Sequence, residues 1–168
     1  MPTADFQLRA AESDAELRRI EALARRIWPK TYDGILSPEQ LEYMLHMMYD
    51  LPVLRRELAE GVCFRILYDG ESPIGFFSCG PYREGVAKLH KLYLDYDYHH
   101  LGLGSYMLQA AKQLLREAGY RHMLLNVNKN NRNALRAYER NGLVLEQAVV
   151  NDIGNGFVMD DYVFGCDL

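Results

Sequence analysis

Residues 94–115, LDYDYHHLGLGSYMLQAAKQLL, begin with the pattern of a strand, pass through Gly102 and Gly104, and continue as an amphipathic helix. Glycine at such a turn lets the backbone approach a ligand closely. The free N–H groups at the start of a helix favour an anion. This stretch therefore predicts a phosphate-binding turn, and the rest of the chain has to indicate which compound carries the phosphate.

Two common phosphate-binding motifs do not match this turn. A dinucleotide-binding turn needs a third glycine three residues after the second, and this chain has Met107 there. A nucleoside-triphosphate loop needs Gly-Lys-Ser/Thr, which does not follow. NAD and nucleoside triphosphates are therefore disfavoured as ligands. Taken alone, a single Gly-x-Gly before a helix fits a tight turn without a ligand equally well.

Capping signals mark the first two helices. Ser13 and Glu16 form a capping box, and Pro29 is expected to end that helix near Trp28. A second helix is expected over residues 37–49, in which Ser37 is the N-cap and Gln40 its reciprocal partner. Further helices are predicted at 53–61, after the glycine turn as far as Gly119, and at 131–142.

Strands are predicted at residues 5–11, 62–69, 73–80, 86–96, 121–128, 143–150 and 157–168. The segment 70–72, GES, has the composition of a hairpin turn. Helices come early, then a hairpin, a β-α-β-α unit and a final hairpin. This order predicts an α/β domain with a largely antiparallel sheet and one crossover in its middle.

Composition narrows the class of protein. The chain has 168 residues, 49% apolar and 25% charged, which suits one soluble domain. A net charge of −4 argues against a general nucleic-acid binder, and we expect no membrane partner, because no signal-peptide or membrane-spanning run occurs. The three cysteines suggest neither a zinc site nor a disulfide framework, so we expect no metal and a cytoplasmic location.

Two motifs in the same order and spacing resemble those of the GNAT N-acetyltransferase superfamily. Residues 89–114, LHKLYLDYDYHHLGLGSYMLQAAKQL, are similar to the family's fourth strand, its Gln/Arg-x-x-Gly-x-Gly/Ala loop and the next helix. Residues 126–143, NVNKNNRNALRAYERNGL, are similar to its fifth strand and its Asn-x-x-Ala-x-x-x-Tyr-x-x-x-Gly-Phe helix, with Leu143 in place of phenylalanine. Residues 28–45 and 152–164 are similar to bacterial members, some of which act on polyamines or other small amines.

The resemblance covers nearly the whole chain and implies a single GNAT domain over residues 1–168. That fold is α/β with α+β character. It has a mixed, mostly antiparallel sheet of about seven strands, helices on both faces, and a central β-α-β-α unit that binds the cofactor.

The cofactor implied by the resemblance is acetyl-CoA. Its pantetheine arm would lie in a splay between the strand through Leu92 and the strand through Asn126, and its pyrophosphate on the glycine turn. His99 departs from the family's Gln or Arg, so more of the pyrophosphate contact is expected to come from backbone N–H groups. The implied cofactor residues are Leu92, Tyr93, Leu94, His99, His100, Leu101, Gly102, Leu103, Gly104, Ser105, Asn126, Asn131, Asn133, Ala134 and Tyr138.

Tyr138 and His90 are the candidate catalytic residues. The resemblance implies that Tyr138 is the general acid that returns a proton to the departing thiolate, a step that suits a phenol. The alternative is a core tyrosine packed under the sheet. Period-two alternation places His90 on the face of Leu92 and Leu94, where relatives carry a glutamate. A role in removing the proton of the amine and a plain core histidine are equally open.

The acceptor pocket is expected between the early helices and the last strands. Its candidate residues are Trp28, Tyr32, Tyr43, Met44, Met47, His90, Met159 and Asp160. Aromatic and methionine side chains at helical spacing fit a plain core as well. Asp160 and its neighbour Asp161 could attract a cationic substrate, although acidic strand ends are common.

Three hypotheses from different classes follow. The first is an N-acetyltransferase that moves an acetyl group from acetyl-CoA to a primary amine, in a small molecule or a peptide. The second is an acyl-CoA-binding sensor with little turnover, which the replacement at His99 favours and Tyr138 opposes. The third is a protein-interaction module without coenzyme A. The exposed edge of the final hairpin is compatible with a homodimer.

Overall fold

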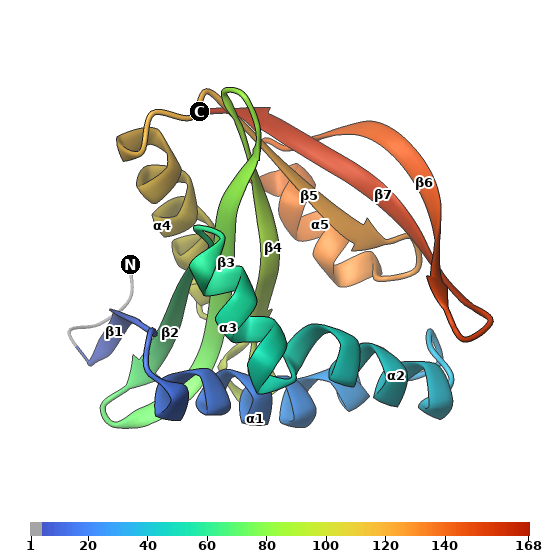
Figure 1. Cartoon of the computed structure of the whole chain (residues 1–168). Helices are drawn as coiled ribbons and strands as arrows, with labels where there is room; N and C mark the ends of the chain where they lie inside the picture. The colour runs from blue at the N-terminus through green and yellow to red at the C-terminus, as the bar shows by residue number, and fades with distance from the viewer. Residues whose placement is uncertain (1–4) are drawn as a thin grey trace.

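The computed structural model describes residues 5–168. Seven strands form one sheet in the order β1-β2-β3-β4-β5-β7-β6 (Figure 1). Their bounds are β1 Phe6–Ala10, β2 Cys63–Asp69, β3 Ser72–Arg83, β4 Val86–Leu94, β5 His122–Asn128, β6 Val144–Gly154 and β7 Phe157–Asp167. Within these residues β4 and β5 are the parallel pair, and the other neighbours are antiparallel. The predicted mixed sheet is confirmed.

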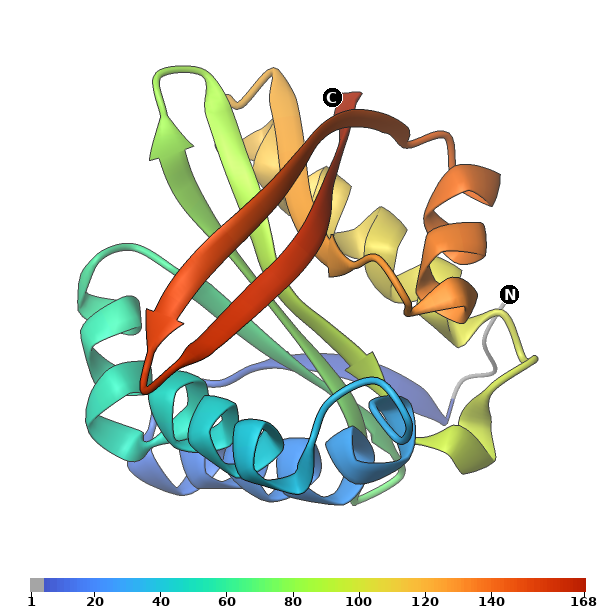
Figure 2. The same cartoon turned by 90° about the vertical axis from the view of Figure 1, so that its right-hand side faces the viewer.

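Helices cover both faces of the sheet, as predicted (Figures 1 and 2). They are α1 Asp14–Thr31, α2 Pro38–Tyr49 and α3 Leu51–Ala59 on one face, and α4 Leu103–Glu117 and α5 Arg132–Arg140 on the other. The adjacent residues Phe76 and Phe77 of β3 point to opposite faces, because side chains alternate along a strand. Phe76 joins the core under α1, and Phe77 joins the core under α4.

The prediction that Pro29 ends the first helix is wrong. The helix continues to Thr31, and the N–H of Tyr32 donates to the carbonyl of Trp28 at 2.9 Å. A proline inside a helix costs about 3 kcal/mol. Burying a large aromatic side chain stabilises the folded state by about 4–6 kcal/mol. Trp28 is fully buried and Tyr32 nearly so. The extra turn is therefore favoured because it keeps both rings in the core.

Two local predictions also need correction. Ser37 caps α2 by accepting the N–H of Gln40, but the Gln40 side chain donates to the carbonyl of Val158 at 2.7 Å instead of returning to the cap. The predicted strand 86–96 ends at Leu94, because the Asp95 carboxylate accepts the N–H of Asp97 and starts a 3₁₀ turn.

The β6–β7 hairpin joins the early and late parts of the chain. It crosses the molecule so that its tip lies beside α2 (Figure 2), where the Tyr43 hydroxyl donates to the carbonyl of Ile153 at 2.6 Å. At the other end of the hairpin His122 of β5 contacts Glu146 of β6 at 2.7 Å and Asp167 of β7 at 2.9 Å. Burial would lower the pKa of His122, but the two carboxylates outweigh it, so the pKa is raised.

This cluster predicts a pH-dependent part of the stability. Because the pKa of folded His122 lies above its unfolded value, its contribution is fully present below about pH 6.5 and is lost as pH rises through the folded pKa. We expect the thermal midpoint of the protein to fall between pH 6 and pH 9 by more than that of His122→Gln. Equal slopes for the two proteins would show that the pair of carboxylates does not hold the imidazolium.

Candidate functional site

The central feature of the site is the point where two parallel strands separate. The pairing of β4 with β5 begins at Val86 and His122 and stops at Leu89 and Leu125, although both strands continue. The divergence is visible between β4 and β5 in Figures 1 and 2. A cleft of about 720 Å³ opens there, lined by α1, α2, β4, α4, β5, α5 and β7. The predicted splay beside Leu92 is confirmed.

A β-bulge in β4 lies at the edge of this splay. Cys79 pairs with Leu89 and Ser78 with Lys91, so His90 is the extra residue. Leu89 and Leu92 both pack in the core under α4. The period-two alternation is therefore interrupted at the bulge, and the side of the sheet on which His90 lies stays a prediction. His90 nevertheless lines the cleft, as the acceptor-site prediction required.

His90 is held in its neutral form. Burial, together with the neighbouring positive charges of Lys91 and Lys88, lowers the pKa of its imidazole to about 4. A neutral imidazole can accept a hydrogen bond from an ammonium at neutral pH. It is too weak a base to keep the proton.

The charge beside His90 belongs to a buried ion pair that the sequence did not indicate. Lys91 is 3% exposed, and its Nζ contacts the Glu57 carboxylate of α3 at 2.9 and 3.3 Å. The ammonium also lies 5.3 Å from the centre of the Tyr49 ring. The pair fastens the bulge to α3, since a buried ammonium deprived of its partner would be strongly destabilising.

The glycine turn at the start of α4 has the geometry of an anion-binding site. Gly102 is the N-cap, with φ of +77°, and no side chain of residues 5–168 caps the helix. The first helical bond runs from the N–H of Tyr106 to the carbonyl of Gly102, so the N–H groups of residues 103–105 have no acceptor within the helix. A Cβ built on Gly104 would meet no atom within 4 Å. The space above Gly104 is open to a ligand.

The residues before the turn differ from one another in their contacts. The Nε2 atom of His99 lies 2.9 Å from the carbonyl oxygen of Leu94, and its ring stacks on Tyr96, so this side chain anchors the loop. His100 has a positive φ of 67° and lines the cleft. The Leu101 side chain is 56% exposed and does not line the cleft, so only its backbone remains a candidate contact.

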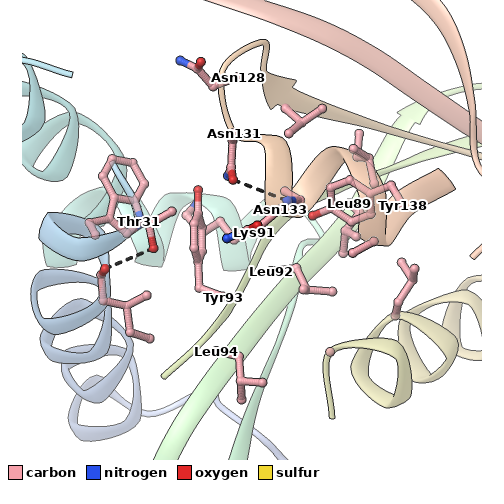
Figure 3. A pocket seen from close by; sticks show the side chains of 18 of the residues that line it. Thr31, Leu89, Lys91, Leu92, Tyr93, Leu94, Asn128, Asn131, Asn133 and Tyr138 are labelled. Atoms are coloured by element: carbon pink, nitrogen blue, oxygen red, sulfur yellow. Dashed lines mark hydrogen bonds between the residues drawn. The ribbon is translucent and has the colours of Figure 1, made fainter. Parts of the chain in front are cut away.

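Helix α5 presents the second motif to the cleft. Asn131 caps it by accepting the N–H of Ala134 at 3.4 Å, as its position predicted. Figure 3 shows Tyr138 reaching from α5 to a position beside Leu89 of β4. The environment of the Tyr138 phenol raises its pKa, first by desolvation and then by the nearby Tyr32. The phenol is therefore protonated throughout the neutral range.

The cleft gathers fourteen of the predicted cofactor residues around the splay. They are Leu92, Tyr93, Leu94, His99, His100, Gly102, Leu103, Gly104, Ser105, Asn126, Asn131, Asn133, Ala134 and Tyr138. Tyr93 points away from Leu92, toward α1 (Figure 3), and its hydroxyl lies 2.8 Å from that of Tyr32. Tyr93 thus also contacts Tyr32, one of the predicted acceptor residues.

Five of the eight predicted acceptor residues line the cleft: Trp28, Tyr32, Met44, His90 and Met159. Tyr43 does not line it, because its hydroxyl is bound to Ile153 and its ring packs on Phe157. Met47 packs against the core under α1 instead. Met48 lines the cleft in the place predicted for Met47, because it lies four residues after Met44 and so shares the same helix face.

Asp160 is the third predicted acceptor residue that lies outside the cleft. Its side chain is 52% exposed and contacts Lys129 Nζ at 2.6 Å. Asp161 lines the cleft instead and is 2% exposed. The alternation along β7 places Asp161 on the same face as Met159 and Asp160 on the other. That alternation was the signal in the sequence that could have separated the two aspartates.

This chain is similar to known acetyltransferases in sequence and in fold. The model of a family described as Acetyltransferase (GNAT) family matches residues 17–143. A spermidine N(1)-acetyltransferase of Thermoplasma acidophilum is 26% identical over 150 residues, which cover 86% of this chain and 90% of the relative.

Solved structures show the same fold. PaiA N-acetyltransferase from Thermoplasma acidophilum, crystallised in complex with coenzyme A, superposes with a TM-score of 0.83 at 24% identity, over 97% of this chain and 99% of that one. A GCN5-related N-acetyltransferase from Rhodopseudomonas palustris superposes with a TM-score of 0.80 at 19% identity, over 100% and 99% of the two chains.

Proposed function

Since this chain belongs to the acetyltransferase (GNAT) family, we propose that it moves an acetyl group from acetyl-CoA to a primary amine of a small molecule, such as a polyamine, by direct attack. The observation that carries the proposal is the cleft at the β4–β5 splay, which has the glycine turn and Tyr138 on one side and an acceptor end on the other. The relative named for spermidine supports a small amine as the acceptor.

The residues around the splay fit the cofactor. The N–H groups of residues 103–105 and the open space above Gly104 suit a pyrophosphate. The backbone of β4 beyond Leu89 is not paired with β5 and is therefore available to the amide groups of a pantetheine arm. Acetyl-CoA supplies the acetyl group as an activated thioester. A backbone N–H near Leu92 or Tyr93 is suited to polarise its carbonyl.

Two side chains handle protons in this proposal. The Tyr138 hydroxyl donates its proton to the sulfur of the leaving thiolate, and the raised pKa keeps that proton in place until then. His90 accepts a hydrogen bond from the amine, directly or through water, and the proton goes on to solvent water, since a pKa of about 4 prevents the imidazole from holding it. No metal or covalent enzyme intermediate is needed.

His90→Ala tests the relay. We expect kcat/KM to fall by about 10²-fold below the pKa of the acceptor amine and the loss to shrink as pH rises, because the free base needs no relay. When wild-type kcat/KM is plotted against pH, its fall on the acidic side should reflect the pKa of the acceptor amine. No second ionisation should appear near pH 6.5. His46→Ala on α2 is the control, since His46 is exposed and outside the cleft. A loss independent of pH would reduce His90 to a residue that shapes the pocket.

The proposed function is tested by a substrate screen. Acetyl-CoA should raise the thermal midpoint, because a ligand that binds only the native state stabilises it. Release of free thiol from acetyl-CoA should then be measured with polyamines, amino acids, aminoglycosides and peptide N-termini. Stabilisation without transfer to any of these amines would favour an acyl-CoA sensor, and no stabilisation would reject the coenzyme A site altogether.

A further inference from the structure

Asp161 is a buried carboxylate on the cleft wall without a cationic partner. It is 2% exposed, and within the described part of the chain its one side-chain hydrogen bond is a long one from Asn126 Nδ2, at 3.5 Å. Among residues 5–168 no Lys, Arg or His nitrogen lies within 4.0 Å of it. A carboxylate taken out of water is costly unless it is paired, so this position lacks the group that would balance its charge.

The two cations that act on Asp161 from a distance, Lys129 and Lys88, each have another contact. Lys129 contacts Asp160 at 2.6 Å, and Lys88 Nζ lies over the ring of Tyr82, 5.2 Å from its centre. The hydroxyl of Tyr32 is 2.8 Å from that of Tyr93. The pKa of Asp161 is raised, chiefly by burial and also by the charge of Asp160, although the Asn126 bond and the distant charges of Lys88 and Lys129 oppose this rise.

The cleft around Asp161 suits an aliphatic chain. Met44 and Met48 of α2 and Met159 of β7 line its acceptor end together with Trp28 and Tyr32. Flexible thioether side chains pack well against a methylene chain. The wall therefore offers an apolar channel with one unbalanced negative charge.

We propose that Asp161 binds a second, non-reacting ammonium group of the acceptor, so that diamines and polyamines are preferred over monoamines. The inference rests on the proposed acetyl transfer and names the acceptor class for it. The attacking nitrogen must lose its proton, and an adjacent carboxylate would stabilise the protonated form and oppose that loss. A second ammonium has no such requirement, and its pairing with Asp161 removes the uncompensated charge.

The test compares two acceptors of equal chain length, 1,4-diaminobutane and n-butylamine. We expect wild-type kcat/KM to favour the diamine by about 10- to 100-fold, the value of one charge-assisted hydrogen bond to a buried carboxylate. Asp161→Asn should remove most of this preference by acting on the diamine alone. The control, Asp160→Asn, should keep it, because Asp160 faces solvent and Lys129. An equal loss for both amines, or an unchanged ratio, would overturn the inference.

A second measurement separates this inference from the proposed function and covers a variant that fails to fold. In wild-type protein loaded with coenzyme A, binding of 1,4-diaminobutane should lower the pKa of the Asp161 carboxyl, followed by ¹³C NMR, while n-butylamine should not. If this shift occurs and no amine is acetylated, Asp161 is a diamine site and the transferase proposal fails. If amines are acetylated and the shift does not occur, the transferase proposal stands and the role of Asp161 is rejected.

Discussion

Tyr138→Phe is expected to lower kcat by about 10²- to 10⁴-fold, the usual contribution of a positioned general acid, with little change in the affinity for acetyl-CoA. The substitution removes the phenolic oxygen and keeps the ring that lines the cleft. A thiolate that leaves without a proton is a poorer leaving group, so the loss belongs to the chemical step. Single-turnover measurement at saturating acetyl-CoA isolates that step from product release.

The matched control is Tyr106→Phe. Tyr106 packs against the same core and lies outside the cleft, so the loss of its hydroxyl should leave kcat within a factor of about two. A Tyr138→Phe protein with full single-turnover rate would remove Tyr138 from the mechanism. A protein that loses acetyl-CoA affinity in proportion to its rate would make Tyr138 a binding residue.

Gly104→Val is expected to raise the Kd for acetyl-CoA by about 10²- to 10⁴-fold, as for two lost hydrogen bonds of about 1.5–3 kcal/mol each to a charged group. The added side chain would occupy the open space where the first N–H groups of α4 face a pyrophosphate. The fold should be kept, because the Cβ meets no protein atom within 4 Å and the residue has no positive φ. Titration calorimetry measures the affinity and thermal melting the stability.

Gln113→Val is the control for this variant, because it places the same side chain on an exposed position of α4 away from the turn. Gly102→Val would be a poorer test. The φ of +77° at Gly102 would be strained in valine, so loss of binding and loss of stability would coincide. Unchanged affinity in a folded Gly104→Val protein would show that the turn does not hold the pyrophosphate.

The cofactor side of the site could be predicted from the sequence because its signals are local. The glycine turn, the Asn131 cap and Tyr138 each depend on residues within one strand-turn-helix segment. The seven strands also follow from local alternation and turn residues. The extra turn of α1 did not follow, since the burial of Trp28 by distant strands outweighs the local effect of Pro29.

The acceptor side was harder to predict because contacts far apart in the sequence decide it. The Tyr43 hydroxyl donates to the carbonyl of Ile153, 110 residues later, and this bond holds the side chain outside the cleft. Lys91 forms an ion pair with Glu57, 34 residues earlier. The bulge at His90 interrupts a pattern that alternates regularly in the sequence, and it becomes visible only in the register with β3. The choice between Asp160 and Asp161 depends on which residues of β7 face the cleft. Met159 faces it, so the alternation along the strand selects Asp161.

The place of β7 in the sheet has a consequence for how the chain acquires its shape during synthesis. β7 is the last of the seven strands to leave the ribosome, yet it lies between β5 and β6. Until it arrives, β5 has an open hydrogen-bonding edge that invites pairing with other chains. The nascent protein is therefore exposed to such pairing until β7 emerges, and the part of the cleft wall formed by Met159 and Asp161 is completed only then.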